Sequence, residues 1–233
     1  MTESGAMLDH RLRALVLGSE PFASLDRNPA AEIALAIAQR SSAELAIEGA
    51  TLPVSYERLP KHIGELVAAR KADIVLGLGL FVGAATIRVE STAINRADFG
   101  VSDNEGRFIR DEPLISNGPP ARMTPYRAED VAAAIRAQGI PARASHFAGT
   151  HLCNLVLYHL LGLSGDKTIA GFVHLPLLPE QVAALMTEST RDAPRRMPFS
   201  PELPSMSRDQ QMAAVATALQ TLATILRNRA CPV

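Results

Sequence analysis

Short apolar runs alternate along this chain with segments in which apolar residues recur at helical spacing. The runs end at glycine, proline or polar residues, which is typical of buried strands. They predict strands at residues 14–17, 43–47, 74–76, 86–95, 142–146 and 169–174. The helical stripes between them predict helices at residues 28–39, 62–69, 128–138, 153–163 and from 207 onward.

Helix starts and loops support this division. Asn28-Pro29 places a capping side chain before a proline that suits a first helical turn. Ser207 precedes the last stripe, with a glutamine at the spacing of a capping box. Residues 96–125 are rich in Asp, Asn, Gly and Pro and predict a long surface loop with room for a short hairpin. Residues 194–204 predict a second loop, rich in proline.

The order of the elements predicts an α/β fold. Strands that alternate with helices favour a parallel or mostly parallel sheet with helices on both faces. We see no internal repeat and no low-complexity tract. We therefore expect one domain over residues 1–233, with residues 1–12 as a flexible N-terminal segment.

Composition narrows the classes of function. The chain is 47% hydrophobic and 20% charged, so its 233 residues can bury a core. Its formal net charge is −1 without a basic block, which argues against a nucleic-acid partner. No apolar run has the length of a membrane helix, and the N-terminus lacks the apolar segment of a signal peptide. We expect a cytoplasmic protein that has no membrane partner.

The segment from 148 to 154, Ala-Gly-Thr-His-Leu-Cys-Asn, is the strongest candidate for chemistry. It places Cys153 after small turn residues and at the start of an apolar helical stripe. The N-terminus of a helix has partial positive charge and free N–H groups, and both favour a nucleophilic thiolate. The alternative is a buried structural cysteine, which is the common fate of an intracellular cysteine.

His174 and Glu90 are candidate partners for this thiol. His174 ends an apolar strand just before Pro176, and such strand ends are where ligands bind in open α/β sheets. A neutral imidazole there can take a proton from the thiol and return it to a leaving amine. Glu90 lies among apolar residues of a predicted strand and can orient an imidazole. The alternatives are a core histidine bonded to a backbone carbonyl and an edge-strand glutamate that faces water.

Three weaker patterns remain. Gly77, Gly79 and Gly83 follow a strand as in a dinucleotide-binding loop, but the next segment has the pattern of a strand, not of a helix. His151, Cys153 and His159 match no usual zinc spacing, so we expect no metal. Cys231 lies near the C-terminus and is expected to be a surface thiol.

The chain resembles the pyroglutamyl-peptidase I (pyrrolidone-carboxylate peptidase) family of cysteine peptidases. The resemblance runs from about residue 13 to about residue 226. It rests on six ordered motifs: Gly18 to Phe22 with Asn28-Pro29, Glu90 to Asn95, Asp103-Asn104-x-Gly106, Ala148 to Asn154, Gly171 to Gln181, and Pro204 to Ser207.

The resemblance implies a three-layer α/β/α sandwich around a twisted mixed sheet. It implies a triad of Cys153, His174 and Glu90 that removes N-terminal pyroglutamate from peptides without a cofactor. It also implies a homo-oligomer, either a dimer or a tetramer. A small peptide or amide is then the expected substrate, held by Phe22, Leu80, His151 and Leu152.

The chain departs from the family pattern around the expected pocket. The family loop Gly-Gln-Ala-Gly-Gly-Arg aligns with residues 79–84, so Leu80 replaces the glutamine and Ala84 the arginine. Ser91 replaces the arginine after the glutamate, and His151 and Ser19 replace aromatic residues. We therefore expect an altered substrate pocket. The alternatives are a relative that binds a small acyl ligand without catalysis or with another specificity, and, resting only on the glycines, a nucleotide-binding oxidoreductase.

Overall fold

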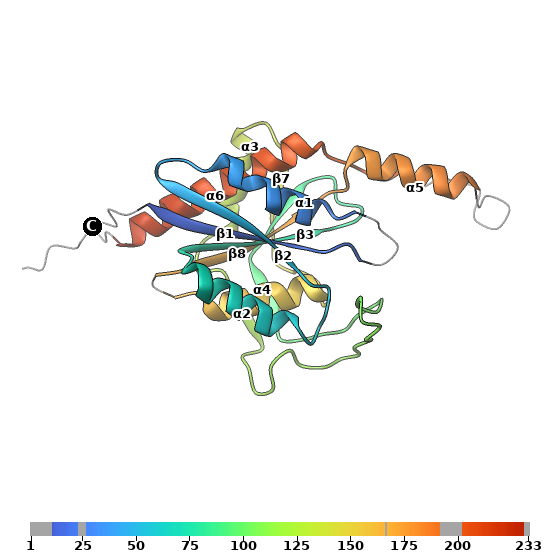
Figure 1. The fold of residues 1–233 in the computed structure, drawn as a ribbon, viewed down its shortest axis with the longest axis horizontal. Helices are drawn as coiled ribbons and strands as arrows, with labels where there is room; N and C mark the ends of the chain where they lie inside the picture. Colours follow the sequence, from blue (N-terminus) through green and yellow to red (C-terminus); the bar gives the residue numbers. More distant parts are fainter. Residues whose placement is uncertain (1–10, 23–26, 166, 192–201, 231–233) are drawn as a thin grey trace, which may run out of the picture.

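A six-stranded sheet forms the centre of the molecule (Figure 1). The computed structural model describes residues 11–22, 27–165, 167–191 and 202–230. Across the sheet the strands run in the order β2-β1-β3-β8-β4-β7. Their bounds are Leu45–Leu52 for β2, Leu12–Ser19 for β1, Ile74–Leu80 for β3, Ile169–Leu175 for β8, Ile87–Glu90 for β4 and Ala142–Ser145 for β7.

Strand direction changes once across this sheet. The pairs β1–β2, β1–β3, β3–β8 and β4–β7 are parallel, whereas β4 and β8 are antiparallel. Every residue of β3 and β8 is buried, as expected for central strands with helices on both faces. The prediction of a mostly parallel, mixed α/β sheet is confirmed.

Helices cover both faces of the sheet (Figure 1). Helices α1 (Pro29–Ala36), α3 (Ala128–Ala137) and α6 (Arg208–Ala230) pack on one face, and their apolar side chains join one hydrophobic cluster. Helices α2 (Leu59–Arg70) and α4 (Leu152–Leu163) pack on the other face and belong to a second cluster. The three layers agree with the sandwich that the resemblance implies.

Two helices, α1 and α6, begin where the sequence predicts a helix start. The Asn28 side chain accepts a hydrogen bond from the Ala30 amide at 3.0 Å and caps α1. The Ser207 hydroxyl accepts one from the Gln210 amide at 3.3 Å, directly before α6. A short 3₁₀ helix, η1 (Ile37–Arg40), follows α1 within the predicted helical segment.

Other elements differ from the prediction. The single strand expected at 86–95 is split into β4 and β5 (Thr92–Ile94). The Ser91 amide still donates to the Ser145 carbonyl of β7, but the Ser91 carbonyl accepts from the Thr124 amide, which lies outside the main sheet. Strand β5 pairs with β6 (Ala121–Met123), a short strand inside the expected long loop. Helix α5 (Pro179–Arg191) was not predicted; Pro179 suits its first turn.

Three predictions concern segments that lie partly or wholly outside the described residues. Strand β1 begins at Leu12, the last residue of the segment expected to be flexible, and residues 1–10 lie outside the described part. Cys231 and residues 194–201 of the second predicted loop also lie outside it, whereas residues 202–204 have no regular structure. Among the described helices, none is long and apolar enough to cross a membrane.

Two glycines set the distance between α1 and the sheet. A Cβ atom built on Gly49 would lie 1.7 Å from the Ala34 carbonyl oxygen, and one on Gly18 would lie 2.1 Å from that of Ala30. Both contacts are with helix backbone, which cannot rotate away as a side chain can. The close approach of α1 therefore requires glycine at both positions.

We predict that Gly49→Ala lowers the free energy of unfolding by about 1–3 kcal/mol, because the methyl group forces α1 away from the strand. Urea denaturation measures this change. Gly64→Ala in α2 is the control, since nothing lies within 4 Å of its added Cβ and alanine favours a helix. Equal stability of the two variants would contradict the packing argument.

Candidate active site

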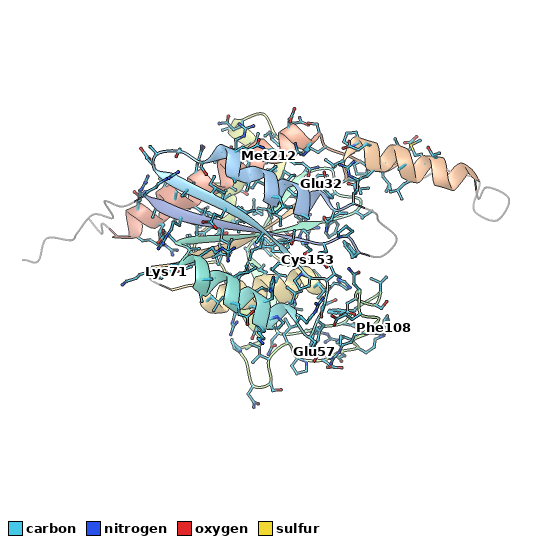
Figure 2. The ribbon with its side chains drawn as sticks, viewed as in Figure 1. Glu32, Glu57, Lys71, Phe108, Cys153 and Met212 are labelled. Carbon is cyan, nitrogen blue, oxygen red and sulfur yellow. The ribbon has the colours of Figure 1, made fainter. Side chains whose placement is uncertain are left out.

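Cys153 is the second residue of α4 and faces the sheet (Figure 2). The residue before the helix, His151, has an extended backbone, and no side chain caps the helix start. Gly149 precedes it with a φ of +88°, a conformation that favours glycine. The N–H groups of the first turn of α4 therefore lack intrahelical partners, and they lie beside the half-buried thiol of Cys153.

Glycines on β3 make room for this thiol. A Cβ atom at Gly79 would lie 2.9 Å from Cys153 Sγ and 2.8 Å from the Phe172 ring, and one at Gly77 would lie 2.5 Å from that ring. These glycines thus serve close packing of α4 and Phe172 against the strand. Strand β4, not a helix, follows them, so the context of a dinucleotide-binding loop is absent from this part of the described chain.

The antiparallel contact of β4 and β8 brings Glu90 to His174. The register pairs Arg88 with His174 and Glu90 with Phe172, so these side chains share the face that carries Gly79. His174 Nδ1 lies 2.8 Å from Glu90 Oε1. Both side chains are buried, with residue exposures of 2% and 0%. With Nδ1 bonded to the carboxylate, Nε2 is the nitrogen left to face Cys153.

The site favours a protonated imidazole beside an ionised carboxylate. Burial lowers the pKa of His174, but the charge and hydrogen bond of Cys153 and those of Glu90 outweigh it and raise the pKa to about 9. Burial raises the pKa of Glu90, but the hydrogen bond and charge of His174, the Ser145 hydroxyl and the Arg88 charge lower it overall. At neutral pH these interactions stabilise the imidazolium form of His174, and its charge then lies next to the Cys153 sulfur.

Arg88 is a member of this cluster that the sequence analysis missed. Its Nε donates to Glu90 Oε1 at 3.2 Å, and its Nη2 donates to Ser145 Oγ at 2.7 Å. Its guanidinium also lies 4.1 Å from the centroid of the Phe81 ring. Two signals in the sequence could have indicated Arg88. Residues 88 and 90 lie on the same face of a strand, and a buried carboxylate needs a counter-charge.

A small pocket lies beside the thiol. It has about 280 Å³ of space, part of which is open to solvent, and is lined by Ser19, Phe22, Asn28, Val54, Gly79, Leu80, His151, Leu152 and Cys153. The structure thus brings together the four residues that were predicted to bind substrate. The Phe22 and His151 rings lie 6.3 Å apart between centroids and are tilted by 34°.

His151 is held from outside the pocket by the loop after β5. Its ring lies 4.3 Å from that of Phe99, and its Nε2 lies 3.4 Å from the Val101 carbonyl oxygen. Burial lowers its pKa, against smaller opposing contributions from the Val101 carbonyl and Asp103. The imidazole is therefore mainly neutral at pH 7. The loop also bonds the start of α4, since Thr150 Oγ1 donates to the Asp98 carbonyl at 2.8 Å.

Asn154 and Asp103 belong to the matching motifs without an assigned role. Asn154 accepts from the Ile94 amide at 2.9 Å and donates to the carbonyls of Ile94 and Arg96 at 2.9 and 3.0 Å, so it fastens α4 to β5. Asp103 accepts three backbone N–H groups and so orders the loop beside the pocket. Both residues hold the elements that carry the site.

No group of three potential metal ligands occurs among the residues that the structure describes. His159, six positions after Cys153 on α4, is partly buried, and burial followed by the Arg122 charge lowers its pKa. It lies beside Tyr158, with ring centroids 6.2 Å apart.

A thiol at a helix start that faces a buried histidine–carboxylate pair, on an α/β fold, is the arrangement of a cysteine peptidase. Comparison with known proteins agrees with this class. A family model described as pyroglutamyl peptidase matches residues 12–225, and the chain belongs to this family of cysteine peptidases.

The relatives cover most of the chain. Pyrrolidone-carboxylate peptidase of Pyrococcus furiosus is 30% identical over 212 residues, which are 90% of this chain and 97% of the relative. That of Chromobacterium violaceum is 36% identical over 167 residues, 72% and 79% of the two chains.

Solved structures give the same result. A mutant pyrrolidone carboxyl peptidase from P. furiosus superposes with a TM-score of 0.83 at 30% identity, covering 92% of this chain and all of that one. The Thermococcus litoralis enzyme gives 0.82 at 29% identity, covering 93% and 96%. The resemblance seen in the sequence is confirmed.

We predict that Glu90→Gln slows alkylation of Cys153 by iodoacetamide at pH 7 by about tenfold. The carboxylate raises the pKa of His174, so its loss lowers that pKa and depopulates the imidazolium that lies beside the Cys153 sulfur and favours its nucleophilic form. Mass spectrometry of alkylated peptides over pH 5–10 follows the reaction at each cysteine. Cys153→Ala gives the background from Cys231, and an unchanged pH profile in Glu90→Gln would contradict the coupling.

Proposed function

We propose that this chain removes an N-terminal pyroglutamyl group, or a related small acyl group, from peptides. Cys153 is the nucleophile, His174 the general acid and base, and Glu90 the residue that orients and stabilises the imidazolium. The observation that carries the proposal is the 2.8 Å contact of His174 and Glu90, coupled to a thiol at the edge of a small pocket.

The geometry supports a two-step acyl transfer. The Cys153 thiolate attacks the amide carbonyl, and N–H groups at the start of α4, including that of Cys153, stabilise the oxyanion. The C–N bond breaks as His174 gives its proton to the leaving amine, which leaves a thioester on Cys153. Water then attacks the thioester with His174 as base, releasing the acid and regenerating thiolate and imidazolium.

The pocket supports a small, flat acyl group. Two van der Waals contacts of about 3.5 Å each place a planar ring between two others that are about 7 Å apart. The Phe22 and His151 rings, with centroids 6.3 Å apart and planes tilted by 34°, need a slight separation and a turn toward parallel to accept a lactam. The wall otherwise consists largely of apolar side chains such as Val54, Leu80 and Leu152.

Leu80 supports a second candidate, a relative with another acyl specificity. It is buried at the pocket and offers no hydrogen bond where the family pattern has an amide. A buried lactam that loses such a bond is bound less well by about 1–3 kcal/mol. A small apolar acyl group would not have this cost. A relative that binds such a ligand without turnover is the remaining alternative, and the assay below separates it.

The setting of the enzyme is part of the proposal. A nucleophilic thiol needs a reducing compartment, which supports the cytoplasm. Helix α5 extends away from the sheet and its helices (Figure 1), which supports a role in contacts between copies of a homo-oligomer, a dimer or tetramer. We also propose that one domain carries the whole activity, because the residues of the candidate site come from segments 19–28, 54, 79–90 and 151–174.

We predict that the wild-type chain hydrolyses a pyroglutamyl fluorogenic amide and that Cys153→Ala reduces kcat/KM by at least about 10³-fold, because the acyl-enzyme cannot form. A burst of fluorophore in the wild type titrates the active sites. His174→Ala is the companion variant, and Cys231→Ala is the control that keeps full activity. Full activity of Cys153→Ala would contradict the mechanism, and no turnover of any acyl amide by the wild type would favour the non-catalytic alternative.

We predict a second pH effect that arises in the pocket. Burial lowers the pKa of His151 below 6.5, so acidification through that pKa puts a charge against the acyl group. KM should therefore rise as the pH falls through this lowered pKa, by about tenfold for each pH unit at the limit. His151→Phe should remove this rise while keeping the ring. Steady-state kinetics from pH 5 to 8 test it, and the same rise of KM in both proteins would contradict the assignment.

A further inference from the structure

Three exposed apolar side chains lie outside the acyl pocket, on the segments that follow β3 and β7, and we call them the apolar patch. They are Phe81, which contacts the His174 ring, Val82 and Phe147, and they are 38%, 48% and 53% exposed. None of the three lines the pocket that contains Phe22 and His151. Hydrolysis of the acyl group does not explain why these exposed side chains beside the catalytic residues are apolar.

The patch is held in place by contacts with the catalytic cluster. The Phe81 ring lies edge-on to the His174 ring, with centroids 5.4 Å apart. The Arg88 guanidinium lies over Phe81 at 4.1 Å and donates from Nη2 to the Phe147 carbonyl at 3.2 Å. Arg88 thus joins the segment after β3 to the segment after β7. Its side chain is only 12% exposed, so this junction is fixed.

The turn after β3 presents Val82 at the tip of the patch. The Ala84 amide donates to the Phe81 carbonyl at 3.1 Å, and Gly83 has a φ of +89°. This tight turn keeps Val82 exposed next to Phe81. In the family pattern given above, these two positions are alanine and glycine, so the apolar surface here is a property of this chain.

The reaction determines what reaches this patch. For His174 to protonate the leaving amine, that nitrogen must come within about 3 Å of the imidazole. The acyl group occupies the pocket at the start of α4, so the residue that follows the scissile bond extends from His174 over the surface outside that pocket. Phe81, which is partly exposed and in ring contact with His174, lies on the side of the imidazole to which this residue extends.

We infer that Phe81, Val82 and Phe147 form a subsite for the leaving residue, and that the preferred substrates carry a bulky apolar residue directly after the acyl group. The inference rests on the proposed function and adds the substrate class. Apolar contact on an open surface discriminates modestly, so we expect about a tenfold preference in kcat/KM.

Three peptides test the subsite: pyroglutamyl-Phe-Ser, pyroglutamyl-Ala-Ser and pyroglutamyl-Asp-Ser, with release of the dipeptide measured by chromatography. We expect a ratio of kcat/KM for Phe over Ala of about ten, and a lower value for Asp than for Ala. In Val82→Ser and in Phe147→Ser the Phe-over-Ala ratio should fall to about two. Leu35→Ser, which removes an exposed apolar side chain of α1, is the matched control and should keep the wild-type ratio.

The outcomes separate this inference from the proposed function. Cleavage of all three peptides at equal rates would overturn the subsite and leave the proposed function intact, whereas no cleavage of any of them would count against the function itself. Analytical ultracentrifugation adds a further arm. If Val82→Ser and Phe147→Ser reduce the oligomeric state and leave the ratio at ten, the patch is an interface between copies and the inference is wrong.

Discussion

The hydrogen-bonded pair of His174 and Glu90 is the interaction on which the rest of the site depends. Two ionisable groups that are almost fully buried are stable only if each supplies the partner that the other lost on leaving water. The carboxylate keeps its charge through the imidazole and the Arg88 guanidinium, which both approach Oε1. Removing one partner would leave a buried charge unpaired, so the three side chains act as one unit.

The antiparallel contact of β4 and β8 sets the geometry of this pair. Its register places Arg88 directly opposite His174 and leaves Glu90 two positions along the same face, opposite Phe172. The carboxylate can then approach the imidazole from the side while the arginine covers it. Gly79, on the other side of His174, provides the space in which the Cys153 thiol completes the row.

Much of this arrangement could be predicted from the sequence, and the reasons differ from one element to the next. Strands β3 and β8 are buried on both faces and so give continuous apolar runs, which are the plainest pattern in the chain. The three site residues were predictable as types in order, since a thiol at a helix start and a histidine at a strand end have local signals. The strand register that joins these residues has no local signal in the sequence. The direction of β4 and the partners of Arg88 depend on strands that are far apart in sequence.

The same distinction between local and long-range signals explains the two errors in the elements. Ser91 interrupts a segment whose alternation continues through it, because its backbone bonds residues 124 and 145, which no local pattern reveals. Helix α5 follows Pro176 and begins at Pro179, and proline is compatible both with a turn and with the first turn of a helix. Catalysis and recognition divide in a similar way. The proposed triad depends on the buried pair of His174 and Glu90, which tolerates little change, whereas Leu80 and His151 line the pocket and Phe81 and Val82 are exposed. In the proposed mechanism the chemistry therefore depends on buried charges, and the choice of substrate on the pocket and the exposed residues beside it.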